Sequence, residues 1–165
     1  LLDMIAEVRG ETHDLHGRQV GIGTLLSAAL FQRVLALESP ALRPGPEAID
    51  EHFWSLPPVV AAVSEQYHAK KARLEPIMRT ISGHDAWDQL RTKLAAETQS
   101  PKTIRTWLQR AGAAVSVADI GCSRERVKSA VLHMHEIRKR FTIVDLAWLA
   151  GVLPDQADDL LDEWL

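Results

Sequence analysis

Apolar side chains recur at helical spacing along nearly the whole chain. The clearest case is the segment 17–37, where the apolar face consists of Val20, Leu25, Leu26, Ala29, Leu30, Val34 and Leu37. Runs rich in valine, isoleucine and aromatic residues with strict apolar-polar alternation, which would indicate strands, are lacking. The sequence therefore predicts an all-α fold, a compact bundle of eight or nine helices.

Proline, glycine and capping residues set the predicted helix boundaries. Gly10 and Gly112 are expected to end helices, whereas Asp85, Ser100 and Ser123 are expected to cap the starts of helices. The sequence leaves two alternatives for the helix predicted at 59–73: it ends there, or it continues past Pro76 to residue 81 with a kink. The predicted helices are approximately 1–8, 17–37, 47–56, 59–73, 86–97, 102–111, 124–139, 142–150 and 154–164.

Length and composition describe an ordinary globular domain. The 165 residues are 46% hydrophobic and are predicted to form a single domain, 1–165. A formal net charge of -3 gives no general attraction to nucleic acid or anionic membranes. No apolar run approaches the roughly 20 residues of a membrane span. The single cysteine, Cys122, cannot form an internal disulfide, which fits a cytoplasmic protein.

The segment from His13 to Gly23 is the strongest candidate site. His13 and His16 lie three residues apart at the predicted start of a long helix, and neutral imidazole is a common metal ligand. Gly17, Gly21 and Gly23 follow, although each glycine costs a helix up to about 1 kcal/mol relative to alanine. The spacing alone leaves two interpretations open: a metal site, or a polar-capped helix with small residues for tight packing.

Two stretches resemble one enzyme family. The run 16–25, HGRQVGIGTL, resembles the HGxxVGxGT segment of sn-glycerol-1-phosphate dehydrogenases, in the superfamily of iron-containing alcohol dehydrogenases, glycerol dehydrogenase and dehydroquinate synthase. The runs 107–112, WLQRAG, and 137–145, IRKRFTIVD, resemble the family's closing WLxxAG and IRxRYT segments, with Phe141 in place of tyrosine. The resemblance predicts the C-terminal helical domain of a dehydroquinate-synthase-like enzyme.

The resemblance implies a metal-dependent, NAD(P)-linked dehydrogenase that interconverts dihydroxyacetone phosphate and sn-glycerol 1-phosphate. His16 matches the last of three ligands to a divalent metal, which would be zinc, nickel or iron. The run 1–4 resembles residues that directly follow an upstream histidine ligand, so an aspartate and that histidine are expected before Leu1. NAD(P) would be bound mainly by an N-terminal domain absent from these residues. The isolated chain is therefore expected to be inactive, with no catalytic residue and with unknown cofactor-binding residues.

Other residues receive secondary roles. His13 is interpreted as a group beside the metal ligand or the substrate, or equally as a solvated loop histidine. Arg138 and Arg140 could bind the phosphate of a small-molecule substrate, or lie solvated on a helix. His133 and His135 are two apart on a predicted helix and would point in different directions, so they are poor chelators. Assembly into a homo-oligomer is left open.

Several alternatives remain. Within the superfamily, the chain could belong to another dehydrogenase or to a dehydroquinate-synthase-like cyclase. It could also be a non-catalytic helical interaction module, or a helix-turn-helix DNA-binding domain built on 115–128. The region 102–140 carries nine basic and three acidic residues, and Arg124 and Lys128 would be solvent-facing and able to meet a groove. The run 116–120 is too short for a normal first helix, so nucleic acid is not expected as a partner.

Overall fold

The computed structural model describes residues 1–12 and 14–165. Within these ranges the chain forms nine α-helices and one 3-10 turn, η1, and no β-strand, which confirms the predicted all-α bundle. In chain order the elements are α1 (Leu2–Arg9), α2 (His16–Leu35), α3 (Glu51–Trp54), α4 (Pro57–Ile81), α5 (Ala86–Glu97), α6 (Pro101–Arg110), η1 (Ala118–Ile120), α7 (Arg124–His133), α8 (Ile143–Leu149) and α9 (Ala157–Trp164).

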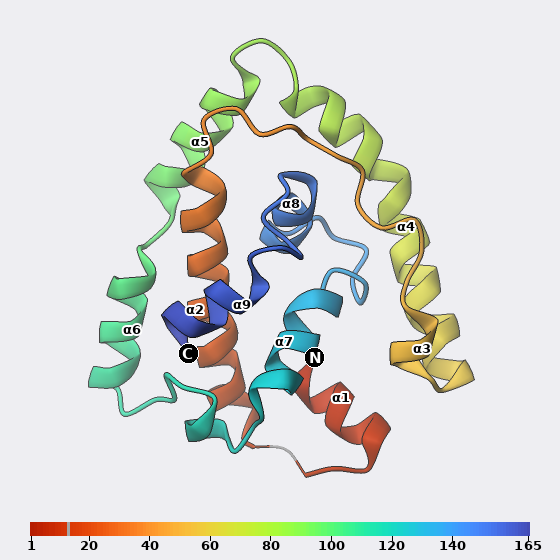
Figure 1. Ribbon diagram of the computed structural model, residues 1–165, viewed down its shortest axis with the longest axis vertical. Coiled ribbons are helices and arrows are strands. Elements are labelled where there is room, and N and C mark those ends of the chain that lie inside the picture. The colour runs from red at the N-terminus through yellow and green to blue at the C-terminus, as the bar shows by residue number, and fades with distance from the viewer. Residues whose placement is uncertain (13) are drawn as a thin grey trace.

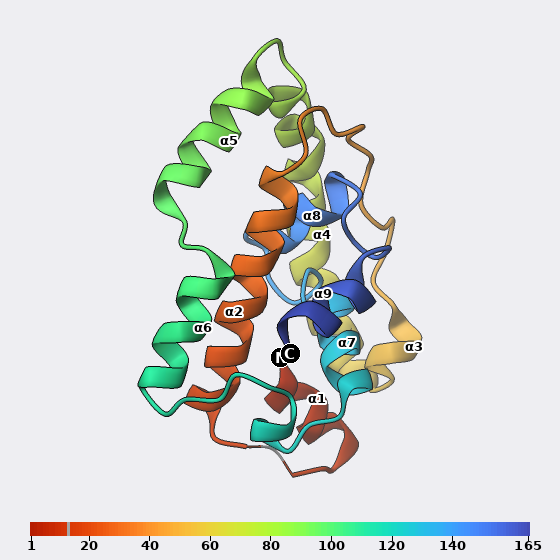
Figure 2. The same cartoon turned by 60° about the vertical axis from the view of Figure 1, so that its left-hand side comes forward.

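The long helix α2 is the centre of the arrangement. It packs against α5, α6, α8 and α9, while α4 packs against α3 and α5, and α1 packs against α7. Figure 1 shows α4 and α5 meeting at one end of the molecule and α1 lying at the other. Figure 2 shows α6 continuing the line of α5 along α2. The amino end of α2 therefore lies at the same end of the molecule as α1.

The core is built on one face of α2. Ile22, Leu26, Leu30 and Val34 recur every four residues and are at most 4% exposed. They belong to one cluster with the buried residues of α8 and α9. Burying each such side chain contributes roughly 1.5–3 kcal/mol. Val20 departs from the predicted apolar face, because it is 49% exposed.

Three predicted helix ends are confirmed by their caps. Gly10 ends α1 in the left-handed region with a φ of 65°, which glycine adopts without steric cost. The Ser100 hydroxyl accepts a hydrogen bond from the Thr103 N–H, and the Ser123 hydroxyl accepts one from the Arg126 N–H. These two serines therefore act as the predicted N-caps of α6 and α7.

The helix α4 continues past Pro76 to Ile81, the extension that the sequence left open. Three other predictions of helix boundaries were wrong. The helix α3 has only four residues instead of spanning 47–56. Asp85 precedes α5 in a left-handed conformation, so its side chain makes no capping hydrogen bond. The helix α7 ends at His133 rather than near residue 139, because the next residues turn and bury two polar side chains, His135 and Glu136.

A buried ion pair joins α4 to α8. Lys70 Nζ lies 2.6 Å from Asp145 Oδ1, and the two side chains are 1% and 3% exposed. Lys70 also donates to the carbonyl oxygen of His135, and Asp145 accepts from the Thr142 N–H at 2.8 Å at the start of α8. These hydrogen bonds satisfy both charges, so removing one partner would leave the other buried and uncompensated.

We expect Lys70→Met to lower the free energy of unfolding by about 3–5 kcal/mol, because it leaves the Asp145 carboxylate buried without its cation. Urea denaturation followed by circular dichroism measures this loss. The double variant Lys70→Met/Asp145→Asn removes both charges and keeps an oxygen that can accept from Thr142, so it should be more stable than Lys70→Met. A double variant no more stable than the single one would contradict this account of the pair.

His135 is buried beside the same ion pair. Its ring packs against those of Tyr67 and Trp148, with centroids 5.7 and 4.9 Å away, and its side chain is 4% exposed. Burial lowers the pKa of His135 to about 4, and the nearby negative charge of Glu136 opposes this shift only in part. His135 is therefore neutral in the folded protein near neutral pH.

This lowered pKa predicts acid sensitivity. Unfolding lets His135 take up a proton at its ordinary pKa of about 6.5, so the unfolded state binds more protons between about pH 6.5 and 4. Stability should fall as the pH drops through that range, by up to about 1.4 kcal/mol per pH unit from this group. When His135→Leu is unfolded in urea across the same pH range, its free energy of unfolding should fall less steeply with decreasing pH than that of the wild-type protein. Equal pH dependence in the two proteins would rule out His135 as the source of the acid sensitivity.

Candidate metal centre

His16 is the first residue of α2, and a local network fixes where that helix begins. Asp14 accepts from the Leu15 N–H at 2.8 Å and from Arg18 Nε at 2.7 Å, and Gln19 Nε2 donates to the Asp14 carbonyl at 3.0 Å. The hydrogen bond from Arg18 is the main reason that the pKa of Asp14 is lowered. The turn before α2 is thus held by side chains on both sides of His16.

The imidazole of His16 contacts a carboxylate from another helix. Its Nδ1 lies 2.7 Å from Asp3 Oδ2, and Asp3 belongs to the first turn of α1. The His16 side chain is 76% exposed, whereas that of Asp3 is 24% exposed. Since Nδ1 is engaged by Asp3, Nε2 is the nitrogen left to bind another group.

An apolar groove of about 210 Å³ opens beside this pair, between α1, α2 and α7. His16 and Asp3 lie on its border, and the exposed Val20 forms part of its wall. Its other walls include Leu2, Gly23, Leu26, Val131 and Met134. An apolar cavity with a few convergent polar groups is the usual form of a small-molecule site.

Of the three glycines in α2, one is explained by tight helix packing, and two are not. A Cβ at Gly21 would lie 3.3 Å from the Leu108 side chain of α6, so Gly21 serves close helix packing. A Cβ at Gly17 or Gly23 would meet nothing within 4 Å. The space at Gly23 is part of the apolar groove. The packing explanation therefore accounts for Gly21 and leaves Gly17 and Gly23 without a structural need.

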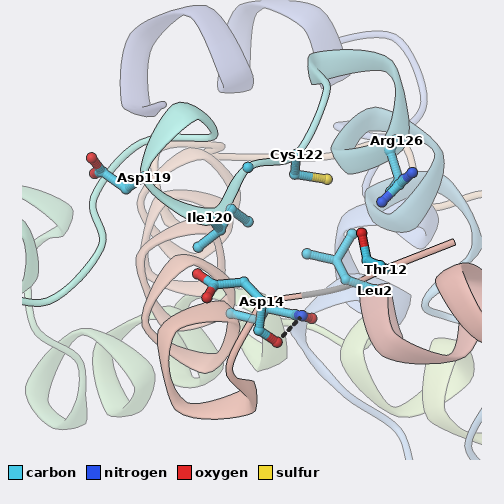
Figure 3. A pocket seen from close by; sticks show the side chains of 9 residues that line it. Leu2, Thr12, Asp14, Asp119, Ile120, Cys122 and Arg126 are labelled. Atoms are coloured by element: carbon cyan, nitrogen blue, oxygen red, sulfur yellow. Dashed lines mark hydrogen bonds between the residues drawn. The ribbon is translucent and has the colours of Figure 1, made fainter.

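A second, more polar pocket of about 290 Å³ adjoins the groove and shares Leu2 and Gln19 with it. Figure 3 shows Asp14 on one side of this pocket, with Cys122 and Arg126 on the opposite side. Arg126 forms an ion pair with Glu11, and burial raises the pKa of the Cys122 thiol. Among the described lining residues, the arginine charge is therefore already compensated, and the raised pKa of the thiol disfavours its reactive thiolate form.

Of the site residues predicted from the sequence, His16 lies at the border of the apolar groove. His13 lies outside the described residues. Arg138 and Arg140 are exposed in the segment between α7 and α8, so the prediction that a helix carries them was wrong.

The described residues do not form a complete metal site. Among them, no group of three or more histidine, cysteine, aspartate or glutamate side chains is arranged to hold an ion. His16 is suited to be one ligand of such a site, because its imidazole is exposed and the Asp3 carboxylate contacts Nδ1, which leaves Nε2 for the metal. The chain can thus contribute one imidazole to a metal shared with donors outside this set.

Nothing in the sequence predicts that Asp3 contacts His16. Thirteen residues separate it from His16, so no helical spacing relates the two. The groove is also a tertiary feature, because α7 contributes a wall more than 100 residues away along the chain. A carboxylate in the first turn of a helix is ordinarily explained by the helix dipole alone.

The basic residues of α7 are engaged by α9. Arg124 lies 2.7 Å from both Asp158 Oδ1 and Asp162 Oδ1, and Lys128 Nζ lies 2.5 Å from Asp158 Oδ2. Both side chains are 37% exposed, so they face solvent as predicted, and they also tie α9 to α7 through ion pairs that the sequence did not predict. The element before them, η1, is a three-residue 3-10 turn, as its short sequence predicted.

We expect the double variant Arg124→Gln/Lys128→Gln to keep its helical content but to melt at a slightly lower temperature, because α9 loses its ionic contacts with α7. The difference should shrink in high salt, which screens exposed charges. Thermal melts followed by circular dichroism test this expectation. Lys93→Gln, at an exposed lysine of α5, serves as the control. A salt-independent difference would show that the contacts stabilise α9 by packing.

Comparisons of the chain with protein-family models, with curated proteins and with solved structures find no match. Among the described helices, none combines the length and the apolar character that crossing a membrane requires. The geometry around His16 and the resemblance of the segments 16–25, 107–112 and 137–145 are therefore the basis for inferring a function.

Proposed function

We propose that this chain is the helical, metal-ligating domain of a metal-dependent, NAD(P)-linked dehydrogenase that acts on dihydroxyacetone phosphate and sn-glycerol 1-phosphate. The observation that carries the proposal is His16: an exposed imidazole at the start of α2, hydrogen-bonded through Nδ1 to a carboxylate and bordering an apolar groove. This arrangement leaves Nε2 to bind zinc, nickel or iron.

The residues of this chain would have distinct tasks in that reaction. His16 would hold the metal from the α2 side, and the groove would keep water away from the reacting carbon. Arg138, exposed in the segment between α7 and α8, would bind the substrate phosphate. When bound, a divalent metal supplies Lewis-acid polarisation of the substrate oxygen, which eases hydride exchange with a nicotinamide. The nicotinamide would be bound mainly by a domain outside these residues.

A second candidate is another dehydrogenase of the same superfamily that acts on a less polar alcohol. The apolar lining of the groove favours it, because Leu2, Val20, Leu26 and Val131 offer no hydrogen bonds to a hydroxylated substrate. The DNA-binding alternative has no such support, because Asp158 and Asp162 already pair with the basic residues of α7. A substrate panel containing phosphorylated and unphosphorylated alcohols would distinguish the two dehydrogenases.

The proposal predicts the effect of His16→Ala in the complete enzyme. Metal content, measured by elemental analysis, and NAD(P)H-dependent reduction of dihydroxyacetone phosphate should fall together, because two remaining ligands cannot close a site that needs three. The helical content should not change, since the His16 side chain is largely exposed. The isolated chain, which lacks a nicotinamide site under this proposal, should show no turnover.

His84→Ala is the matched control, because the His84 side chain is 96% exposed and lies at the other end of the molecule, between α4 and α5. This variant should keep wild-type metal content and turnover. A His16→Ala enzyme with stoichiometric metal and normal turnover would refute the proposed function.

A further inference from the structure

The contact between Asp3 and His16 assigns a role to a residue that the sequence did not single out. Building on the proposed function, we propose that Asp3 is a positioning residue: its carboxylate accepts a hydrogen bond from His16 Nδ1–H and so keeps the Nε2 lone pair available for a metal ion. The distance between Asp3 Oδ2 and His16 Nδ1 is 2.7 Å, within the range of a strong, charge-assisted hydrogen bond.

The acceptor determines the tautomer of the ring. A carboxylate has no proton to give near neutral pH, so the Nδ1 that contacts it must carry the hydrogen. In the neutral imidazole the other nitrogen, Nε2, then holds the lone pair that a metal requires. Ligating histidines in metalloproteins commonly donate their second N–H to a carboxylate, which fixes both the tautomer and the plane of the ring.

The placement of the two residues suits positioning rather than local helix stabilisation. Asp3 lies in the first turn of α1, where its negative charge also interacts favourably with the dipole of that helix. This interaction with the dipole would not require a partner on α2. Asp3 instead spans the gap to His16, and its side chain is the less exposed of the two, so the imidazole is anchored on its inner side.

The surroundings strengthen this anchoring. Asp3 and His16 both border the apolar groove, whose walls include Val20 and Leu26. These apolar walls offer no hydrogen-bond partner that competes with the carboxylate for the ring, although the imidazole itself is largely exposed. Because α1 packs against α7, the position of the carboxylate is set by helix packing and not by a loop.

The experiment reads the tautomer of His16 directly. The ¹⁵N-labelled chain is examined at about pH 8.5, where histidine side chains are ordinarily neutral, in ¹H–¹⁵N spectra that distinguish protonated from unprotonated ring nitrogens. We expect His16 in the wild-type chain to carry its hydrogen on Nδ1. Asp3→Ala should shift the ring toward the Nε2–H form, and Asp3→Asn, whose amide oxygen can still accept, should retain part of the wild-type signal.

A zinc titration of the same samples separates this inference from the proposed function. Zinc ion alone should shift the wild-type His16 resonances, and Asp3→Ala should weaken that binding by about 10- to 100-fold. Asp85→Asn, which alters the exposed contact of Asp85 with His84, is the control and should leave His16 unchanged. Circular dichroism verifies that each variant remains folded.

The outcomes are distinct. A wild-type His16 with its hydrogen on Nε2, or a folded Asp3→Ala chain with unchanged His16 tautomer and zinc affinity, would overturn the role of Asp3. Because a single imidazole binds zinc weakly, the titration continues to a large excess of zinc. A wild-type His16 that does not respond even then would count against the proposed function, while the tautomer spectra would still decide whether Asp3 holds the ring.

Discussion

The apolar face of α2 is the constraint on which the rest of the structure depends. Ile22, Leu26, Leu30 and Val34 are buried along one side of this helix, and α5, α6, α8 and α9 all pack against it. His16 is the first residue of the same helix. The position of the candidate metal ligand is therefore fixed by the best-packed element of the fold, which gives a ligand the rigid support that a loop cannot.

Much of the fold could be predicted because its signals are local. The four-residue recurrence of apolar side chains predicted α2, and Gly10, Ser100 and Ser123 marked helix ends by their own conformational and hydrogen-bonding preferences. The end of α7 was missed for a different reason. The residues after His133 have helical spacing, but burial of His135 and Glu136 in a turn outweighs that local preference.

The candidate site was only partly predictable. His16 has a short sequence signature around it, so it could be proposed from the sequence, while its place beside an apolar groove required the packing of three helices. Asp3 and Lys70 have no local signature. Each acts through a contact with a residue far away in the chain, at His16 and Asp145 respectively, and such pairs follow from the tertiary fold alone.

The hydrogen bond from His16 to Asp3 also makes the site a composite of two helices with very unequal support. The 20-residue helix α2 is held by the main core, whereas α1 has eight residues and packs chiefly on α7. Short, peripherally packed helices open at low free-energy cost, and opening of α1 would release the imidazole while leaving the core intact. The ring orientation therefore depends on α1 remaining in place, and a chain trimmed to begin at α2 would keep the histidine but lose the carboxylate that orients its ring.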